Sequence, residues 1–321
     1  MKRAAYLTLF VAAAISLPYP VAAQSYPAKP IRIIVPFPPG GVDVTIRLFQ
    51  AEMMADIGQP IVIENRPGAN GYAGSEYVAR AAPDGYTLLA TSSSTLAIGP
   101  ALSKTVPFDP LKDFATISMV TRSVNLLVVK PSLPVTSVKE LIDYARRNPG
   151  KMSYGSTGIG SGQHLDPEIF KLAAGVDIVH IPYKGFGPVV QALLGGEIET
   201  AFVTLQVIQP LMAAGKVRAL AVYDGRRYPG LPALPDVTEI LPEFQKTPSW
   251  IGVLGPSALP KPITARLHAS IAKAVNTPQV RAKLEETSIV VANSPEEFAV
   301  DLKNGLEQTI KVQKRLGIQL E

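Results

Sequence analysis

The feature that most constrains the fold of this chain is a repeated alternation of short apolar runs with stretches of helical periodicity. The apolar run 31–35 is followed by a turn, by a helical pattern that begins at Val42, and by a second apolar run at 61–64. A third run at 87–90 completes a β-α-β-α-β series, and a similar series begins near residue 126. This alternation predicts an α/β fold of mostly parallel sheets flanked by helices, because parallel strands need a crossover connection.

Two such series in a chain of 321 residues predict two lobes. The segment after residue 222 is proline-rich and then mostly helical, over 262–276, 278–286 and 294–316. It is too short for a third domain, so we expect it to return and complete the first lobe. The expected division is therefore residues 24–124 with 223–321 as lobe 1 and residues 125–222 as lobe 2, joined by two crossing strands.

The first 23 residues have the pattern of a secretory signal peptide. Lys2 and Arg3 precede an apolar run at 4–17, and small residues at 21–23 fit cleavage after Ala23. The run is too short to span a bilayer comfortably, so export to the periplasm is favoured over a retained N-terminal anchor. Loss of Lys2 and Arg3 lowers the net charge from +5 to +3, which is too small to favour nucleic-acid binding.

Three loops rich in glycine or hydroxyl side chains each follow a predicted strand and precede a predicted helix. They span residues 38–41, 91–95 and 155–162. In open parallel sheets ligands bind beyond the carboxyl ends of the strands, and the free N–H groups of the following helix favour anions. The loops therefore suggest an anion-binding site, although loops of this kind also occur as ordinary turns.

Catalytic and cofactor motifs are missing from the sequence. The chain has no cysteine, which excludes a thiolate nucleophile and a disulfide framework. The glycine-rich loop fails as a dinucleotide motif at Gln163 and as a phosphate loop at Ser161. Of the three histidines, His164 fits a capping or supporting role better than direct ligand contact, His180 a structural role and His268 a surface position. We therefore predict neither catalysis nor a metal or cofactor.

The order of several motifs resembles that of the Bug-type substrate-binding proteins, the periplasmic receptors of tripartite tricarboxylate transporters. The resemblance begins at residues 26–41, YPAKPIRIIVPFPPGG, and runs to the last helix. It continues through ENRPGA (64–69), PDGYT (83–87), DPLKDF (109–114), NPGK (148–151), HIPYKG (180–185), LLGG (193–196), AAGKVRALAV (213–222) and SPEEF (294–298).

The resemblance implies a two-lobe periplasmic-binding-protein fold of type II, a "Venus flytrap", that holds a small carboxylate between its lobes. The ligand would be a di- or tricarboxylate, an acidic amino acid or an aromatic acid, held by backbone N–H groups and ordered waters. The receptor would act as a monomer and deliver this ligand to membrane permease subunits. The ligand-binding residues expected from the loops and the resemblance are Phe37, Pro38, Gly40, Gly41, Asp43, Ser92, Ser93, Ser94, Ser156, Thr157, Gly158, Gly160, Ser161, His164, Tyr183, Val203 and Thr204.

The sequence departs from the family pattern at three places, which leave the ligand open. The loop before Asp43 is one residue short, Asp166-Pro167 stands where the family favours small residues, and Val203-Thr204 replaces a more polar wall. Asp43 is thus either a ligand contact or a residue of the first helical turn, where the helix dipole favours an acid. Two other functions were weighed: a receptor that signals to a histidine kinase, and an exported hydrolase, which the missing nucleophile motif disfavours.

Overall fold

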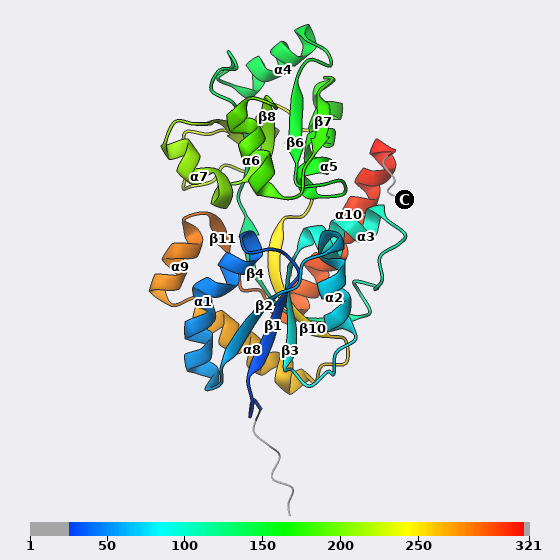
Figure 1. The fold of residues 1–321 in the computed structure, drawn as a ribbon, viewed down its shortest axis with the longest axis vertical. Helices are drawn as coiled ribbons and strands as arrows, with labels where there is room; N and C mark the ends of the chain where they lie inside the picture. The colour runs from blue at the N-terminus through cyan, green and yellow to red at the C-terminus, as the bar shows by residue number, and fades with distance from the viewer. Residues whose placement is uncertain (1–25, 318–321) are drawn as a thin grey trace, which may run out of the picture.

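Two sheets, each covered by helices on both faces, form the protein in a computed structural model that describes residues 26–317 (Figure 1). The predicted signal peptide and its cleavage site lie outside these residues. Within the described range no helix is both long enough and apolar enough to cross a membrane.

The six-stranded sheet defines lobe 1 and has the strand order β11-β4-β10-β3-β1-β2. Its strands are β1 (Ile31–Val35), β2 (Ile61–Asn65), β3 (Thr87–Ser92), β4 (Phe114–Ser123), β10 (Trp250–Pro256) and β11 (Ser288–Val290). The helices of this lobe are α1 (Gly41–Ile57), α2 (Tyr72–Ala79), α3 (Gly99–Leu102), α8 (Lys261–Val275), α9 (Pro278–Glu285) and α10 (Pro295–Leu316), with short helical turns η1 (Ala69–Gly71) and η2 (Ser94–Ile98).

Alternate residues of the lobe 1 strands face two different cores. Ile31 and Ile33 pack against α1 and α8, whereas Ile34 packs with Leu89 and with Phe298 of α10. All five of these side chains are fully buried. Because both faces are covered, the strand reads as a continuous apolar run, and this is why it could be predicted from sequence.

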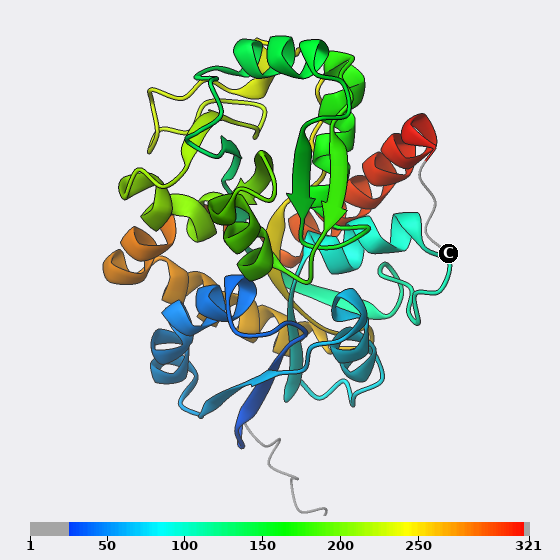
Figure 2. The same cartoon turned by 45° about the horizontal axis from the view of Figure 1, so that its top comes forward.

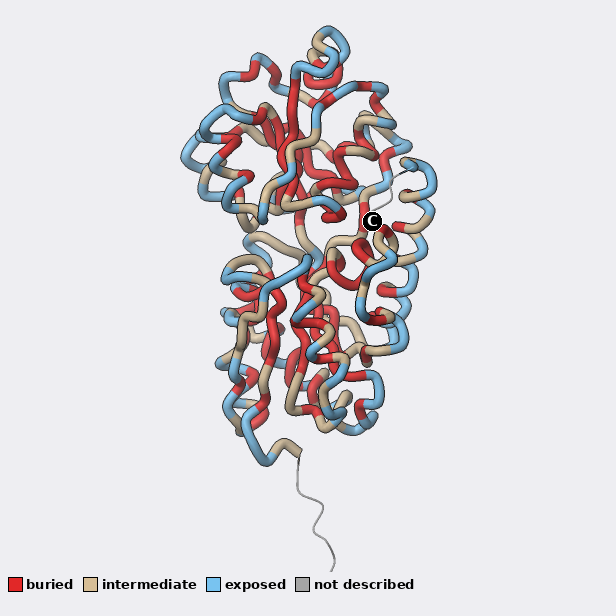
Figure 3. Tube along the Cα trace, turned by 45° about the vertical axis from the view of Figure 1, so that its right-hand side comes forward, coloured by how far each residue is buried: buried red, intermediate tan, exposed pale blue. Residues whose placement is uncertain are grey.

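The five-stranded sheet defines lobe 2 and has the strand order β7-β6-β8-β5-β9. Its strands are β5 (Asn125–Val129), β6 (Ser153–Ser156), β7 (Val179–Pro182), β8 (Thr200–Thr204) and β9 (Arg218–Val222), and its helices are α4 (Val138–Arg147), α5 (Gly162–Ala174), α6 (Phe186–Gly195) and α7 (Leu205–Ala213). A last helical turn, η3 (Val237–Glu239), follows β9. The helices α4 and α5 cover one face and α6 and α7 cover the other. Figure 3 shows buried residues along the strands of both lobes and exposed residues on the outer helices.

Both sheets are mixed, whereas the sequence predicted mostly parallel ones. In lobe 1, β1 is parallel to β2 and β3, but β10 is antiparallel to both β3 and β4. In lobe 2, β6 is parallel to β7 and β8, but β5 is antiparallel to β8 and β9. The reason lies in the connections, since β4 carries the chain out of lobe 1 and its neighbour β10 brings the chain back in the opposite direction.

The two lobes are joined by Ser123–Asn125, by the segment that leads into β10, and by α10. Phe298 and Leu302 of α10 belong to the lobe 1 core, whereas Val312, near the end of the same helix, belongs to the lobe 2 core. In Figure 1 this helix, drawn in red, rises from lobe 1 to the side of lobe 2. The lobes therefore share one helix in addition to the two expected crossings.

Close packing of β10 against α10 leads to the first testable prediction. A methyl group at Gly252 would lie 2.4 Å from Cζ of Phe298 and 3.2 Å from the backbone oxygen of Ser118. We expect Gly252→Ala to lower the free energy of unfolding by about 1–3 kcal/mol, because the ring and strand must move apart. Gly187→Ala in α6, where nothing lies within 4 Å, is the control. Urea unfolding measures both variants, and equal stability would contradict the packing described.

Candidate functional site

The loops singled out by the sequence lie where the two lobes face each other. The N-terminal end of α1 and the loop after β6 both lie between the two sheets (Figure 2). The contact is close, since a methyl group at Gly162, the first residue of α5, would lie 3.4 Å from Cδ1 of Ile98 in lobe 1. The carboxyl ends of strands from both sheets therefore meet at one place, as expected for a ligand site of this fold.

The first loop connects β1 to α1 and bends at two glycines. Gly40 has φ 133° and Gly41 has φ 32°, values that residues with a side chain rarely adopt. The side-chain amide of Asn65 donates to the backbone oxygen of Phe37 at 3.0 Å, which ties the loop to the end of β2. Pro38 is exposed, whereas Phe37 and both glycines are partly buried. The loop thus presents the first N–H groups of a 17-residue helix toward the other lobe.

Asp43 lies buried in the first turn of α1. Its Oδ2 accepts a hydrogen bond from Nε of Arg47 at 2.9 Å. Its Oδ1 is buried and has no hydrogen-bond partner among the residues that the structure describes. A buried carboxylate oxygen needs a donor, so Asp43 is available to a water molecule or to a donor group of a ligand. This geometry is compatible with both roles that the sequence suggested for Asp43, a ligand contact and an acid in the first turn of the helix.

The second predicted loop is partly used for internal support. Oγ of Ser93 accepts a hydrogen bond from the backbone N–H of Trp250 at 3.3 Å, and Thr95 donates to the backbone oxygen of Asn70 at 2.9 Å. Ser93 is buried, whereas Ser92 and Ser94 are partly buried. Ser93 therefore joins η2 to the start of β10, and its neighbours are the more accessible hydroxyls of this loop.

In the third loop, residues 155–161 between β6 and α5, successive backbone N–H groups have different roles. The N–H of Gly158 donates to Oγ of Ser156 at 3.2 Å, and the N–H of Gly160 donates to Nδ1 of His164 at 3.2 Å. The N–H groups of Thr157 and Ile159, which alternate with these two along the chain, have no protein acceptor among the described residues. Gly162 and Gln163, at the start of α5, have no intrahelical acceptor either. The loop thus offers several free donors beside a helix N-terminus, the arrangement that binds anions.

The hydroxyl groups of this loop mostly donate within the loop. Ser161 donates to the backbone oxygen of Gly158 at 2.7 Å, and Thr157 donates to Oε1 of Gln163 at 3.1 Å. Ser156 is fully buried and contacts Nε2 of His180 at 2.7 Å. The three hydroxyls therefore shape the loop, and the backbone N–H groups are the donors left for a ligand.

The remaining predicted residues divide into two groups. The Tyr183 N–H donates to the backbone oxygen of Ser156 at 3.0 Å, which places Tyr183 beside the loop. Thr204 lines a small interlobe cavity of about 10 Å³ together with Thr45 and Thr121, room for about one water molecule. Val203, by contrast, is fully buried in the core of lobe 2 and lines no wall of the cleft.

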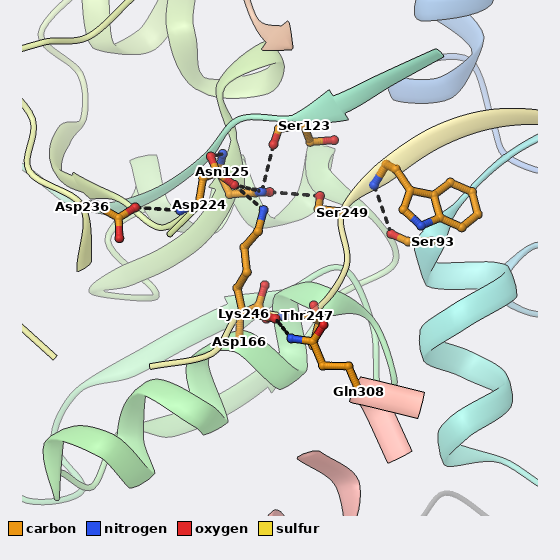
Figure 4. Close-up of polar contacts among 11 residues, drawn as sticks. Ser93, Ser123, Asn125, Asp166, Asp224, Asp236, Lys246, Thr247, Ser249 and Gln308 are labelled. Atoms are coloured by element: carbon orange, nitrogen blue, oxygen red, sulfur yellow. Dashed lines mark hydrogen bonds and ion pairs between the residues drawn. The ribbon is translucent and has the colours of Figure 1, made fainter. Parts of the chain in front are cut away.

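A polar cluster that the sequence did not reveal surrounds the crossings between the lobes (Figure 4). The carboxylate of Asp224 pairs with Lys246 and accepts from the backbone and side-chain N–H groups of Asn125, each at 2.9 Å. The side chain of Gln308 in α10 donates to the backbone oxygen of Lys246 at 2.9 Å. We call Asn125, Asp166, Asp224, Lys246 and Thr247 the hinge cluster. Its members are far apart in sequence, and no local motif announced the cluster.

Asp166 connects helix α5, which follows the loop 155–161, to this crossing. Its Oδ1 accepts the backbone N–H of Thr247 at 2.7 Å, and its side chain is almost entirely buried. Burial raises the pKa of Asp166 to about 7, against the weaker opposing effects of Thr247 and Lys246. The acid that departs from the family pattern therefore lies at the hinge.

Other hollows and clusters do not compete with this site. A broad groove of about 590 Å³ lies on the outer side of lobe 2, between α4, α5 and the end of α10, and contains none of the predicted ligand residues. The described residues also contain no group of three His, Asp or Glu side chains placed to hold a metal ion.

Comparison with known proteins gives the family. Residues 45–316 match the family model described as "Tripartite tricarboxylate transporter family receptor". The curated protein BugT of Bordetella pertussis is 35% identical over 321 residues, which cover 99% of this chain and 98% of BugT.

Two solved structures are similar over most of the chain. Rpa4515 of R. palustris, solved with adipate, has a TM-score of 0.86 and 35% identity, covering 92% of this chain and 99% of that one. MatC of Rhodopseudomonas palustris, solved with malate, has a TM-score of 0.81 and 30% identity, covering 89% of this chain and 99% of that one. These matches confirm the predicted two-lobe binding-protein fold, and the chain belongs to the family of tripartite tricarboxylate transporter receptors.

Proposed function

We propose that the mature protein captures a small organic carboxylate between its two lobes in the periplasm and delivers it to the permease subunits of a tripartite tricarboxylate-type transporter. The observation that carries the proposal is the loop 155–161, whose free backbone N–H groups lie beside the N-terminus of α5 and against lobe 1. Relatives solved with adipate and with malate support a carboxylate as the ligand. The family is one of receptors, so binding and release, with no covalent step, make up the proposed activity.

The proposed mechanism is closure of the lobes on the ligand. The two units that would move are lobe 1, with the six-stranded sheet, and lobe 2, with the five-stranded sheet, and the hinge cluster lies near the crossings between them. The division at residue 222 that was expected from sequence is too early, because Tyr223, Val237 and Phe244 pack in the core of lobe 2. A carboxylate that contacts the α1 loop and the 155–161 loop at once favours the closed form, because it binds both lobes only there. One chain supplies both walls, so the receptor acts as a monomer, and the permease receives the closed form.

A thermal-shift screen of the mature protein tests the proposal. The compounds are C4–C6 di- and tricarboxylates, acidic amino acids, and the aromatic acids benzoate, terephthalate and nicotinate. A ligand at about 100 times its Kd should add about 2.7 kcal/mol to the free energy of unfolding. The corresponding rise in Tm is several degrees for a chain of this size. No shift with any carboxylate, for folded protein stripped of bound ligand, would contradict the proposal.

A pair of glycine variants tests the position of the site. Gly158 has φ 138° within the loop that precedes α5, and Gly175 has φ 63° directly after the C-terminal end of α5. We expect Gly158→Ala and Gly175→Ala each to lower stability by about 1 kcal/mol, since alanine disfavours positive φ. Only Gly158→Ala should weaken carboxylate binding, by about tenfold or more in Kd. Equal binding by both variants would place the ligand elsewhere.

A further inference from the structure

Two stacked histidines lie directly behind the loop 155–161. The rings of His164 and His180 are 4.2 Å apart between centroids and 17° from parallel, and the ring of Tyr154 also stacks on His180, at 4.8 Å. Tyr154 is held in turn, since its hydroxyl donates to Glu168 at 2.7 Å. Three rings from β6, β7 and α5 thus form one stack beneath the proposed anion site.

Each histidine accepts a hydrogen bond that fixes one part of the loop. Nδ1 of His164 receives the N–H of Gly160, so this nitrogen carries no proton and the ring proton is on Nε2. Ser156 is fully buried, and Nε2 of His180 is the described atom that can accept its hydroxyl proton. A buried hydroxyl without an acceptor is unfavourable, so His180 accepts at Nε2 and carries its proton on Nδ1. Ser156 then uses its oxygen to accept the N–H of Gly158.

These contacts explain the alternation of the loop donors. The N–H of Gly160 donates to His164 itself, and the N–H of Gly158 donates to Ser156, which is bonded to His180. The N–H groups of Thr157 and Ile159 are left free. We propose that His164 and His180 are positioning residues for carboxylate binding: as neutral hydrogen-bond acceptors they hold the loop in the conformation that leaves its alternate N–H groups free for the ligand. This inference rests on the proposed function, and it gives His180 a role beyond the structural one expected from sequence.

The proposal requires both rings to be neutral. Burial lowers the pKa of His180 to about 4, helped by the neighbouring His164, and burial also lowers the pKa of His164. The charged groups that act on the two rings are Glu168 and Lys171 on α5, which oppose each other, and Tyr154 faces His180 from β6. Protonation of Nδ1 of His164 would turn it into a donor that faces the N–H of Gly160. Protonation of Nε2 of His180 would leave the buried hydroxyl proton of Ser156 without its acceptor. Carboxylate binding should therefore weaken in acid, as the pH falls toward 4 and His180 becomes protonated.

Four variants and a control distinguish positioning from simple packing. His164→Asn places an amide oxygen near Nδ1, and His180→Gln places one near Nε2, and neither amide can be protonated. The leucine variants at the same positions keep apolar bulk but lose the acceptor. His268→Asn, in α8 of lobe 1, is the control. Calorimetric titration with adipate and malate is measured from pH 3.5 to 8, alongside thermal unfolding to confirm folding.

The expected results are specific to the proposal. Each leucine variant should bind about tenfold or more weakly at pH 7, each amide variant should stay within about threefold of the wild type, and the amide variants should lose less affinity in acid. Wild-type affinity in folded leucine variants, or an unchanged acid loss in both amide variants, would overturn the proposal while leaving carboxylate binding intact. Nitrogen-15 spectra of the imidazoles add a readout that needs no ligand: protons on Nε2 of His164 and Nδ1 of His180 are expected, and any other assignment overturns the proposal even if neither compound binds.

Discussion

Replacement of Asp166 by asparagine is expected to stabilise the protein at pH 8 by about 2–4 kcal/mol. The carboxyl is almost fully buried, and its pKa is raised to about 7. In the unfolded chain an aspartate ionises near pH 3.9, so between pH 4 and 7 the folded state binds a proton that the unfolded state has lost. The contribution of this group to the free energy of unfolding is therefore fully present below about pH 4. This contribution is lost as the pH rises from there through 7. A shift of about three pKa units corresponds to about 4 kcal/mol.

The asparagine variant removes this penalty and keeps the structural contact. Its side-chain oxygen can still accept the N–H of Thr247, as Oδ1 of Asp166 does at 2.7 Å. Urea unfolding at pH 4.5, 6, 7 and 8 should show a difference from the wild type that is small at the lowest pH and grows with pH. Asp177→Asn, at an exposed position of the same lobe, is the control and should change little. Parallel pH profiles for wild type and Asp166→Asn would mean that the buried carboxyl remains ionised.

Replacement of Lys246 by methionine is expected to lower the free energy of unfolding by about 2–4 kcal/mol. Lys246 pairs with Asp224, whose side chain is only 7% exposed. Removing one partner of a buried pair leaves the other charge without compensation, which is much more costly than losing the attraction itself. Asn125 still donates two hydrogen bonds to Asp224, which limits the loss.

A second substitution and a surface pair test this explanation. Asp224→Asn in the Lys246→Met background should restore part of the lost stability, because it removes the uncompensated charge and keeps an acceptor for Asn125. Lys303→Met breaks the exposed pair with Glu307 in α10 and should change stability by less than about 0.5 kcal/mol. Equal losses at Lys246 and Lys303 in chemical unfolding would show that burial of the hinge cluster contributes nothing.

The sequence predicts those parts of the fold whose residues follow a simple period. The strand Ile31–Val35 is apolar throughout because both of its faces are buried, and the loops that follow strands are marked by glycine and hydroxyl residues. The sequence does not reveal β4, where Ser118 and Thr121 are polar but buried in the interior of the sheet. It also misses α7, whose pattern is interrupted by Pro210.

Within the site, the predictions differ in how far they depend on contacts between distant residues. The loop 155–161 is recognisable locally, whereas the position of Val203 depends on which face of β8 points to the core. The hinge cluster depends on partners such as Asp166 and Thr247, which are 81 residues apart. A charge in a loop has the same local pattern whether it lies in solvent or in a buried pair, so only the tertiary structure distinguishes the two.

The position of β10 in its sheet has a consequence for the order in which the chain can fold. β10 lies between β3 and β4, so the first 123 residues cannot form their continuous sheet until residues 250–256 are available. The strands of lobe 2, by contrast, are contiguous in the chain, from Asn125 to Val222. When the chain leaves a ribosome or a membrane channel with its N-terminus first, the residues of lobe 1 appear first, although lobe 1 is completed last. Until β10 arrives, the edges of β3 and β4 are open to wrong partners, and this interval is when the chain most needs protection from aggregation.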